Sequence, residues 1–145
     1  ARSRGLGDVY KRQILFYLKF LTMTNKEIAE AYLNAFNTKD HATMRSLVHD
    51  DFSFHGPLMQ HDSADSFFAA MQGMGDMFAG LQLHGTAQDG DWVGSYYIFK
   101  STVPGLEETH TSEWFNIIDG KIKTSYVVYD ATKWREVMAQ MEQPA

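Results

Sequence analysis

The last third of the chain contains the sequence ETHTSEWFNIIDGKIKTSYVVYD at residues 108–130. Two runs rich in β-branched and aromatic residues flank the dipeptide Asp119-Gly120. Asp-Gly between such runs is among the strongest short-range signals of a β-hairpin. Glu113 lies in the middle of the first run, and a charge in a largely apolar sheet needs a polar partner, water or a function. Glu113 is therefore the first candidate functional residue.

The length of 145 residues is enough for one domain with its own core, but not comfortably for two. The chain has no cysteine, which excludes disulfides and thiolate metal sites. No segment after residue 22 approaches the roughly 20 apolar residues that a membrane-spanning helix needs.

Residues 1–22 do not resemble the sequence of a folded domain. The stretch GDVYKRQ at 7–13 resembles a translated sequencing adapter, and the apolar ILFYLKFL that follows it would be translated upstream sequence. We therefore treat 1–22 as a non-native or disordered tail, with Met23 as the native start. A signal peptide is the alternative, because a basic start precedes an apolar run, but that run is short, contains Lys19 and lacks a small-residue cleavage site.

These boundaries predict one domain at residues 23–141, a short tail at 142–145 and a cytoplasmic location. The N-terminal tail carries five basic residues and one acidic residue, so removing it lowers the net charge from −5 to −9. A domain this acidic is a poor candidate for binding nucleic acid or an anionic membrane surface.

The first half of the domain has helical patterns. Residues 24–37 place apolar side chains at helical spacing, and Thr24 with Glu27 forms a capping box. A second, short helix is predicted at 41–48, with Asp40 as its cap. A third is predicted at 63–78, and two glycines, Gly73 and Gly75, weaken its second half.

The second half has strand patterns. A short strand at 51–55 precedes the third helix and ends at Gly56-Pro57. Short turns containing glycine then connect the strands of an antiparallel meander. These strands are predicted at 81–88, 92–102, 108–118 and 121–129. A helical turn or two at 131–141 closes the chain.

One strand of the meander is apolar on both faces, because Tyr96, Tyr97, Ile98 and Phe99 are consecutive. Both faces of such a strand must be covered. The helices cover one face, and we expect a second subunit on the other, which predicts a homodimer through the sheet.

Three stretches carry a resemblance to a known family: AEAYLNAFNTKD (29–40), VHDDFSFHGP (48–57) and EWFNIIDGK (113–121). With the order of elements, they resemble the nuclear-transport-factor-2-like superfamily, in its SnoaL-like polyketide cyclase and ketosteroid isomerase branch. The resemblance implies an α+β fold in which a curved antiparallel β-sheet wraps around three N-terminal helices, a cone-shaped, cystatin-like roll with a pocket at its wide end.

The resemblance also implies three catalytic positions. The position of the family's catalytic carboxylate falls on His55, which can act as a general base near neutral pH. The acid that hydrogen-bonds the developing oxyanion falls on Glu113, and the phenol of the first helix falls on Tyr32. Each residue also has a structural interpretation: Tyr32 as a core tyrosine, His55 as a cap at the pocket rim and Glu113 as a solvated residue on the outer face.

The register of the hairpin determines what accompanies Glu113. A two-residue loop places Tyr126 opposite Glu113, whereas a three-residue loop with a glycine bulge places Ser125 there, with Val127 and Tyr129 on the same side. The family comparison favours the second register. The residues expected to contact a substrate are Phe54, Phe68, Met71, Trp114, Phe115 and Tyr129.

The sequence and the resemblance together predict a pocket protein for a small hydrophobic molecule. If it is an enzyme, we expect cofactor-free isomerisation, cyclisation or dehydration of a hydrophobic carbonyl compound by acid/base chemistry. The alternative is a non-catalytic ligand-binding or dimerisation module. No metal site is expected. The epoxide-hydrolase members need an arginine held between two aspartates in the pocket, and the domain offers only Arg45 and Arg135, both expected on helix surfaces.

Overall fold

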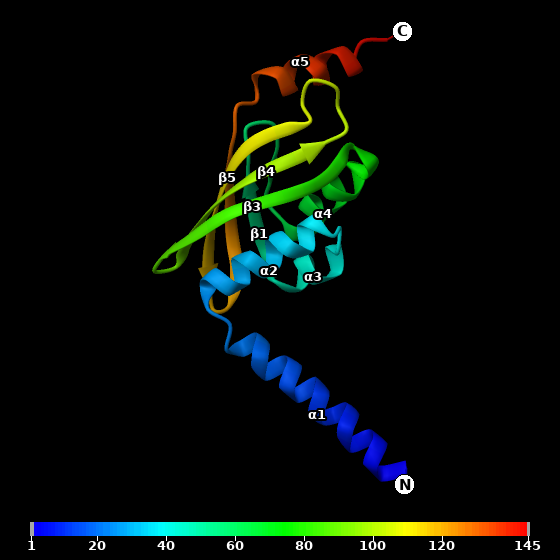
Figure 1. The fold of residues 1–145 in the computed structure, drawn as a ribbon, viewed down its shortest axis with the longest axis vertical. Coiled ribbons are helices and arrows are strands. Elements are labelled where there is room, and N and C mark those ends of the chain that lie inside the picture. Colours follow the sequence, from blue (N-terminus) through cyan, green and yellow to red (C-terminus); the bar gives the residue numbers. More distant parts are fainter. Residues whose placement is uncertain (1, 145) are drawn as a thin grey trace.

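A computed structural model describes residues 2–144 of the chain (Figure 1). The elements in chain order are α1 (Arg2–Leu21), α2 (Asn25–Asn37), α3 (His41–Ser46), β1 (Val48–His55), β2 (Gln60–His61), α4 (Ala64–Gly73), a short 3-10 helix η1 (Gly75–Met77), β3 (Phe78–Asp89), β4 (Trp92–Ser101), β5 (Glu108–Ile118), β6 (Lys121–Val128) and α5 (Thr132–Met141).

The strands form one six-stranded sheet in the order β2-β1-β6-β5-β4-β3. All neighbouring strands are antiparallel except β1 and β6, which are parallel. The sheet curves around α2, α3 and α4, which lie on its concave side (Figure 1). This confirms the predicted α+β architecture. The sequence did not reveal the short edge strand β2 or the parallel pairing of β1.

Local capping explains where the three helices begin. The side chains of Thr24, Asp40 and Ser63 each accept a hydrogen bond from the backbone N–H three residues later. Such caps satisfy N–H groups that have no partner within the helix. The glycines near the end of α4 have the predicted effect, because the α-helix ends at Gly73 and the chain continues as η1 from Gly75, which has a positive φ of 52°.

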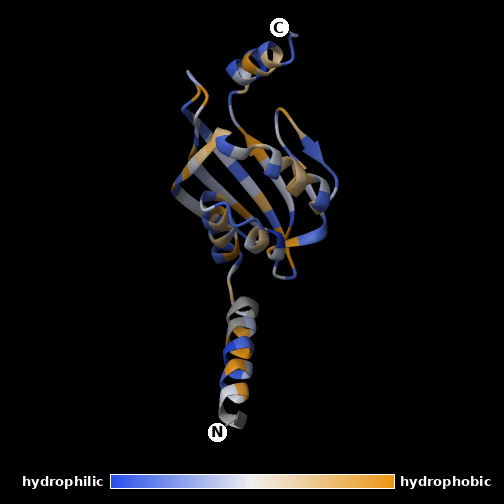
Figure 2. Cartoon of the chain, turned by 90° about the vertical axis from the view of Figure 1, so that its right-hand side faces the viewer, coloured by the Kyte–Doolittle hydropathy of each residue, from blue (hydrophilic) through white to orange (hydrophobic). Residues whose placement is uncertain are grey.

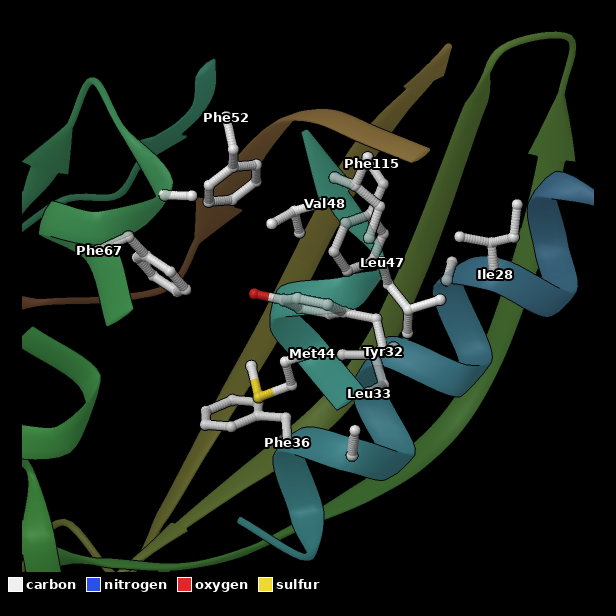
Figure 3. Packing of buried hydrophobic residues seen from close by; sticks show 14 of the residues in the cluster. Ile28, Tyr32, Leu33, Phe36, Met44, Leu47, Val48, Phe52, Phe67 and Phe115 are labelled. Atoms are coloured by element: carbon white, nitrogen blue, oxygen red, sulfur yellow. The ribbon is translucent and has the colours of Figure 1, made fainter. Parts of the chain in front are cut away.

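The core lies between α2 and the concave face of the sheet (Figure 3). Tyr32 of α2 meets Phe115 of β5 edge to face, with ring centroids 5.4 Å apart. Phe52 of β1 makes the same kind of contact with Phe67 of α4 at 5.3 Å. These aromatic pairs connect α2 to β5 and α4 to β1, and Tyr32 and Phe67 also line the site described below.

A bulge sets the register of the β5–β6 hairpin. The loop has two residues, since Ile118 pairs with Lys121, but one extra residue, Lys123, then shifts the register. Val127 therefore lies directly opposite Glu113, and neither predicted partner, Tyr126 or Ser125, does. The bulge lies inside β6 and not in the loop. The residues predicted to lie opposite Glu113 were therefore wrong by one position for Tyr126 and by two positions for Ser125. The predicted face was right, because residues 125 and 127 share the face of Glu113.

The convex face of the sheet is aromatic and exposed. Side chains that alternate with the inner ones point outward, among them Trp92, Tyr96, Trp114 and Tyr126, each about 40% exposed. The Trp114 ring covers Gly94 of the adjacent strand so closely that a Cβ there would lie 2.8 Å from the ring. Gly94 is thus required by the close approach of Trp114.

Helix α1 extends away from the domain (Figures 1 and 2). Every α1 side chain whose burial is described is exposed, including Leu6, Val9 and Leu15. The segment expected to be a non-native or disordered tail is thus helical here, and its origin stays a prediction. None of the described helices has the length and apolar character to cross a membrane.

Deleting residues 1–22 should leave the melting temperature unchanged to within about 1 °C, because a helix with exposed side chains adds little to folding stability. Differential scanning calorimetry of the two chains at equal concentration measures this. A decrease of several degrees would show that α1 stabilises the domain.

Candidate functional site

A cavity of about 600 Å³ lies between the concave face of the sheet and helices α2, α4 and α5. Its walls are mostly aromatic residues and methionines. This volume is within the usual range for sites that hold small organic molecules. Among the described lining residues, Glu113 is the only one with a carboxyl group, and none is lysine, arginine or histidine.

The Glu113 carboxyl group is held from both flanking strands. The Tyr97 hydroxyl of β4 donates a hydrogen bond to Oε1 at 2.9 Å, and the Ser125 hydroxyl of β6 donates one to Oε2 at 2.5 Å. Glu113 itself is only 2% exposed. Its orientation is therefore fixed toward the cavity, which excludes the solvated outward position considered from sequence.

Burial raises the pKa of Glu113 from its ordinary value to about 7, because desolvation disfavours the charged form. The hydrogen bonds from Ser125 and Tyr97 act in the opposite direction, since they stabilise the carboxylate. Near neutral pH the protonated and ionised forms are therefore both populated. A carboxyl group in this state can either donate or accept a proton.

Tyr32 presents its hydroxyl to the same cavity from α2. Figure 3 shows the oxygen pointing away from its helix in the direction of Phe67. Burial and the nearby charge of Glu113 raise the pKa of Tyr32 well above its ordinary value, so the phenol stays protonated. Among the described residues the hydroxyl has no hydrogen-bond partner, which leaves it available to a ligand.

His55 lies on the other side of the sheet. It pairs with Tyr126 in the parallel β1–β6 ladder, and the two rings stack with centroids 4.6 Å apart. Its Nδ1 lies 3.0 Å from the amide nitrogen of Gln60. His55, one of the three catalytic positions implied by the resemblance, therefore does not share the cavity with Glu113 and Tyr32. Side chains alternate along a strand, so the inward position of Phe54 forces His55 outward.

The predicted substrate-contacting residues divide into three groups. Phe54, Met71 and Tyr129 line the cavity, as expected. Phe68 and Phe115 are buried in the core without lining the cavity. Trp114 is on the exposed convex face, because it follows the inward-facing Glu113 directly in β5. The prediction that these last three contact a ligand is wrong.

The role of Tyr97 in holding Glu113 was not predicted, and Ser125 was considered only as the residue opposite Glu113. The helical segment at 131–141 was predicted, but not its place at the cavity. The Trp134 indole donates a hydrogen bond to the Thr109 hydroxyl at 3.0 Å, which fixes the start of α5 beside the cavity. Further along α5, Met138 and Met141 also line the cavity. The apolar residues of 131–141 were a signal that this helix covers an apolar surface.

Arg45 does lie near two aspartates, at 2.6 Å from Asp50 and 3.9 Å from Asp65. Both aspartates are almost fully exposed, and none of the three lines the cavity. This group therefore has no access to a ligand in the cavity. Among the described residues, no cluster of three or more histidine or acidic side chains could hold a metal ion.

Comparison with known proteins agrees with this architecture. The model of a family described as SnoaL-like domain matches residues 29–124. None of the curated proteins matches the chain.

Several solved structures have a similar fold. A protein from Kribbella flavida DSM 17836 is 24% identical, with a TM-score of 0.70 over 81% of this chain and 97% of that one. IdmH from Streptomyces antibioticus, provisionally described as a polyketide cyclase, is 18% identical, with a TM-score of 0.66 over 81% and 99%. An LEH-like epoxide hydrolase of M. tuberculosis is 18% identical, with a TM-score of 0.67 over 81% and 94%. At these identities the likeness shows the fold alone.

The raised pKa of Glu113 predicts a pH dependence of stability. Between its ordinary pKa, near 4.5, and about 7, the folded protein holds a proton that the unfolded chain has released. The free energy of unfolding should therefore decrease as the pH rises through this window, by on the order of 3 kcal/mol from this group. Urea denaturation at pH 5 and pH 8 measures the difference.

Glu113→Gln is the control, since an amide does not titrate. The variant should lose this part of the pH dependence and gain stability relative to the parent protein at pH 8. A parent and variant with the same pH dependence would mean that the carboxyl group titrates normally.

Proposed function

The chain belongs to the SnoaL-like domain family, in the nuclear-transport-factor-2-like superfamily, and we propose that it is a cofactor-free acid/base enzyme acting on a small hydrophobic carbonyl compound. The observation that carries the proposal is a single buried carboxyl group, with a pKa of about 7, in the wall of an apolar cavity. Isomerisation, cyclisation and dehydration next to a carbonyl group all need a group that accepts and donates a proton, and this carboxyl group can do both.

Glu113 takes the role of proton carrier in this proposal. In its ionised form it accepts a proton from the carbon next to the carbonyl group, and in its protonated form it returns the proton to another position. A general acid/base is most effective when its pKa is near the working pH. Tyr97 donates a hydrogen bond to one oxygen of the Glu113 carboxyl group and Ser125 donates one to the other. Each carboxyl oxygen keeps a second lone pair that can accept the proton.

Tyr32 takes the role of donor to the carbonyl oxygen. As that oxygen gains negative charge in the transition state, a preorganised hydroxyl in an apolar cavity stabilises it. The Tyr32 hydroxyl suits this role because it lines the cavity and has no partner among the described residues. His55, the base suggested by the family resemblance, has no role here because it lies outside the cavity.

A non-catalytic ligand-binding module is the second candidate. Two observations favour it: both oxygens of Glu113 already accept hydrogen bonds within the protein, and the imidazole of His55, at the position of the family's catalytic carboxylate, lies outside the cavity. In this alternative, Glu113 is a buried polar group that only orients a bound molecule.

Exchange of carbon-bound hydrogen distinguishes the two candidates without knowledge of the natural substrate. The protein should accelerate the exchange of α-protons of 4-phenylbutan-2-one in D2O, as followed by proton NMR. Glu113→Gln should lower the enzymatic rate by at least about 100-fold, because it removes the proton carrier. Tyr32→Phe should lower it by about 100-fold, because it removes one oxyanion donor.

His55→Ala is the matched control and should leave the rate unchanged. The rate should rise with pH through about 7 as Glu113 ionises. If a panel of hydrophobic ketones binds but none undergoes accelerated exchange, the binding module is the better account.

We also propose that the convex face of the sheet forms a homodimer. This face has no covering layer among the described residues, yet it carries the aromatic side chains of Trp92, Tyr96, Trp114 and Tyr126. Exposed aromatic groups of this density are typical of protein interfaces. The ion pair between Lys100 and Glu108 has no net charge, so it would not repel a second copy of the chain at this face.

Tyr126→Glu should convert the dimer to a monomer, because it introduces one charge per subunit into an apolar interface. Sedimentation velocity at matched concentrations measures the change, and circular dichroism verifies that the fold is retained. Lys133→Glu, an exposed change on α5, is the control and should remain dimeric. A monomeric parent protein at 100 µM (about the highest concentration needed for a specific dimer) would contradict the proposal.

A further inference from the structure

We propose that the cavity binds hydrophobic amines in their protonated form, with the Glu113 carboxylate as counter-ion, and excludes carboxylic acids of the same shape. The inference rests on the proposed function only in that a small molecule occupies this cavity. It does not depend on catalysis.

The described lining of the cavity can carry a negative charge but no positive one. Among the described lining residues there is one carboxyl group and no lysine, arginine or histidine. The groups that face Glu113 come from three elements: Tyr97 from β4, Ser125 from β6 and Tyr32 from α2. All three are hydroxyl groups that remain neutral at physiological pH. The ionised carboxylate therefore has hydrogen bonds but no cation.

Arg135 of α5 is a cation that acts on a residue of the cavity wall. Its charge acts on Tyr129, whose pKa it lowers against the larger, raising effect of burial. Its guanidinium donates a hydrogen bond to the Pro57 carbonyl oxygen at 3.2 Å, and its side chain is exposed. Arg135 makes no ion pair with Glu113 among the described residues, so the counter-ion position beside Glu113 is open to a ligand.

The walls add a second attraction for a cation. Aromatic rings attract an ammonium group through the negative charge of their faces, and the attraction is greatest where water is excluded. Two aromatic residues of the wall lie beside Glu113, since the Tyr97 hydroxyl donates a hydrogen bond to it and the charge of Glu113 contributes to the raised pKa of Tyr32. The methionines near α5 and the end of α4 are flexible and polarisable, which suits a variable apolar body.

The same set of charged groups disfavours the binding of anions in the cavity. A carboxylate ligand would lose its hydration in an apolar cavity, would find no cationic partner there and would lie near the charge of Glu113. A neutral ketone incurs neither cost, because it carries no charge to desolvate. The order of affinity above pH 7 should therefore be amine, then ketone, then carboxylate.

Protonation of Glu113 should make amine binding depend on pH. Below pH 7 the carboxyl group must release its proton before it can act as counter-ion, so the amine affinity decreases by up to about tenfold for each pH unit. Above pH 7 the affinity should be constant until the amine itself loses its proton. Ketone affinity should not change over the same range.

The test uses three probes with one shape: 4-phenylbutylamine, 4-phenylbutan-2-one and 4-phenylbutanoate. Trp134 is the only one of the three tryptophans that lines the cavity, so a Trp92→Phe/Trp114→Phe protein reports binding through Trp134 fluorescence. At pH 8 we expect the amine to bind at least about tenfold more tightly than the ketone, and the carboxylate not to bind measurably. At pH 5.5 the amine affinity should be lower by at least about tenfold.

Glu113→Gln in the same background should remove the preference for the amine and leave ketone binding intact. Glu136→Gln, which removes an exposed carboxylate from α5, is the matched control and should change neither. Should Glu113→Gln fail to fold, the pH dependence of the parent protein tests the same claim without a mutation.

The outcomes separate the two proposals. If the ketone binds and the amine binds no more tightly, or if the amine preference survives in Glu113→Gln, the inference is overturned while the proposed function stands. If none of the three probes binds, both the inference and the proposed function are overturned.

Discussion

Two hydroxyl groups, from Tyr97 and Ser125, hold the carboxyl group of Glu113 at the centre of the sheet, in a cavity whose described lining contains no lysine, arginine or histidine. Leaving a buried carboxylate without a positive partner is unfavourable, and the pKa of about 7 is the direct consequence. The proposed choice among ligands depends on this arrangement, and the charge of Glu113 adds to the larger effect of burial in raising the pKa of Tyr32. Other fully buried polar side chains of the domain, such as that of Ser95, carry no charge and have conventional hydrogen bonds.

Alternation along single strands gives the sheet two different faces. In β5, Glu113 and Phe115 point inward to the cavity and the core, whereas Trp114 between them points outward. In β4, Tyr97 reaches Glu113 while Tyr96 contacts His110 on the convex face. The same few residues therefore build a ligand site on one face and an exposed aromatic surface on the other.

The fold could be predicted because its signals are local. Capping residues, glycine turns and strand patterns placed most elements within a few residues of their observed bounds. The hairpin register was harder, because the bulge at Lys123 lies inside a strand and has no glycine to mark it. That single extra residue determines which side chain lies opposite Glu113.

The candidate site could be predicted only in part. Tyr32 and Glu113 were identified correctly as cavity residues, since the first lies on the apolar stripe of a helix and the second is a charge inside a strand. His55 was assigned from family resemblance, although Phe54 and His55 are adjacent in one strand and cannot both face the cavity. The hydrogen bonds of Tyr97 and Ser125 to Glu113 were not predicted, although Ser125 was considered as the residue opposite Glu113, because contacts between strands are not specified by sequence spacing.

The pKa of Glu113 is the most direct test of this account. Carbon-13 NMR of the δ-carboxyl carbon, assigned by comparison with Glu113→Gln, follows the titration of this one group in the folded protein. We expect a midpoint near pH 7, well above the titration of the exposed glutamates. A midpoint near the ordinary value of 4.5 would contradict the account, because it would mean that the carboxyl group is hydrated or paired with a cation.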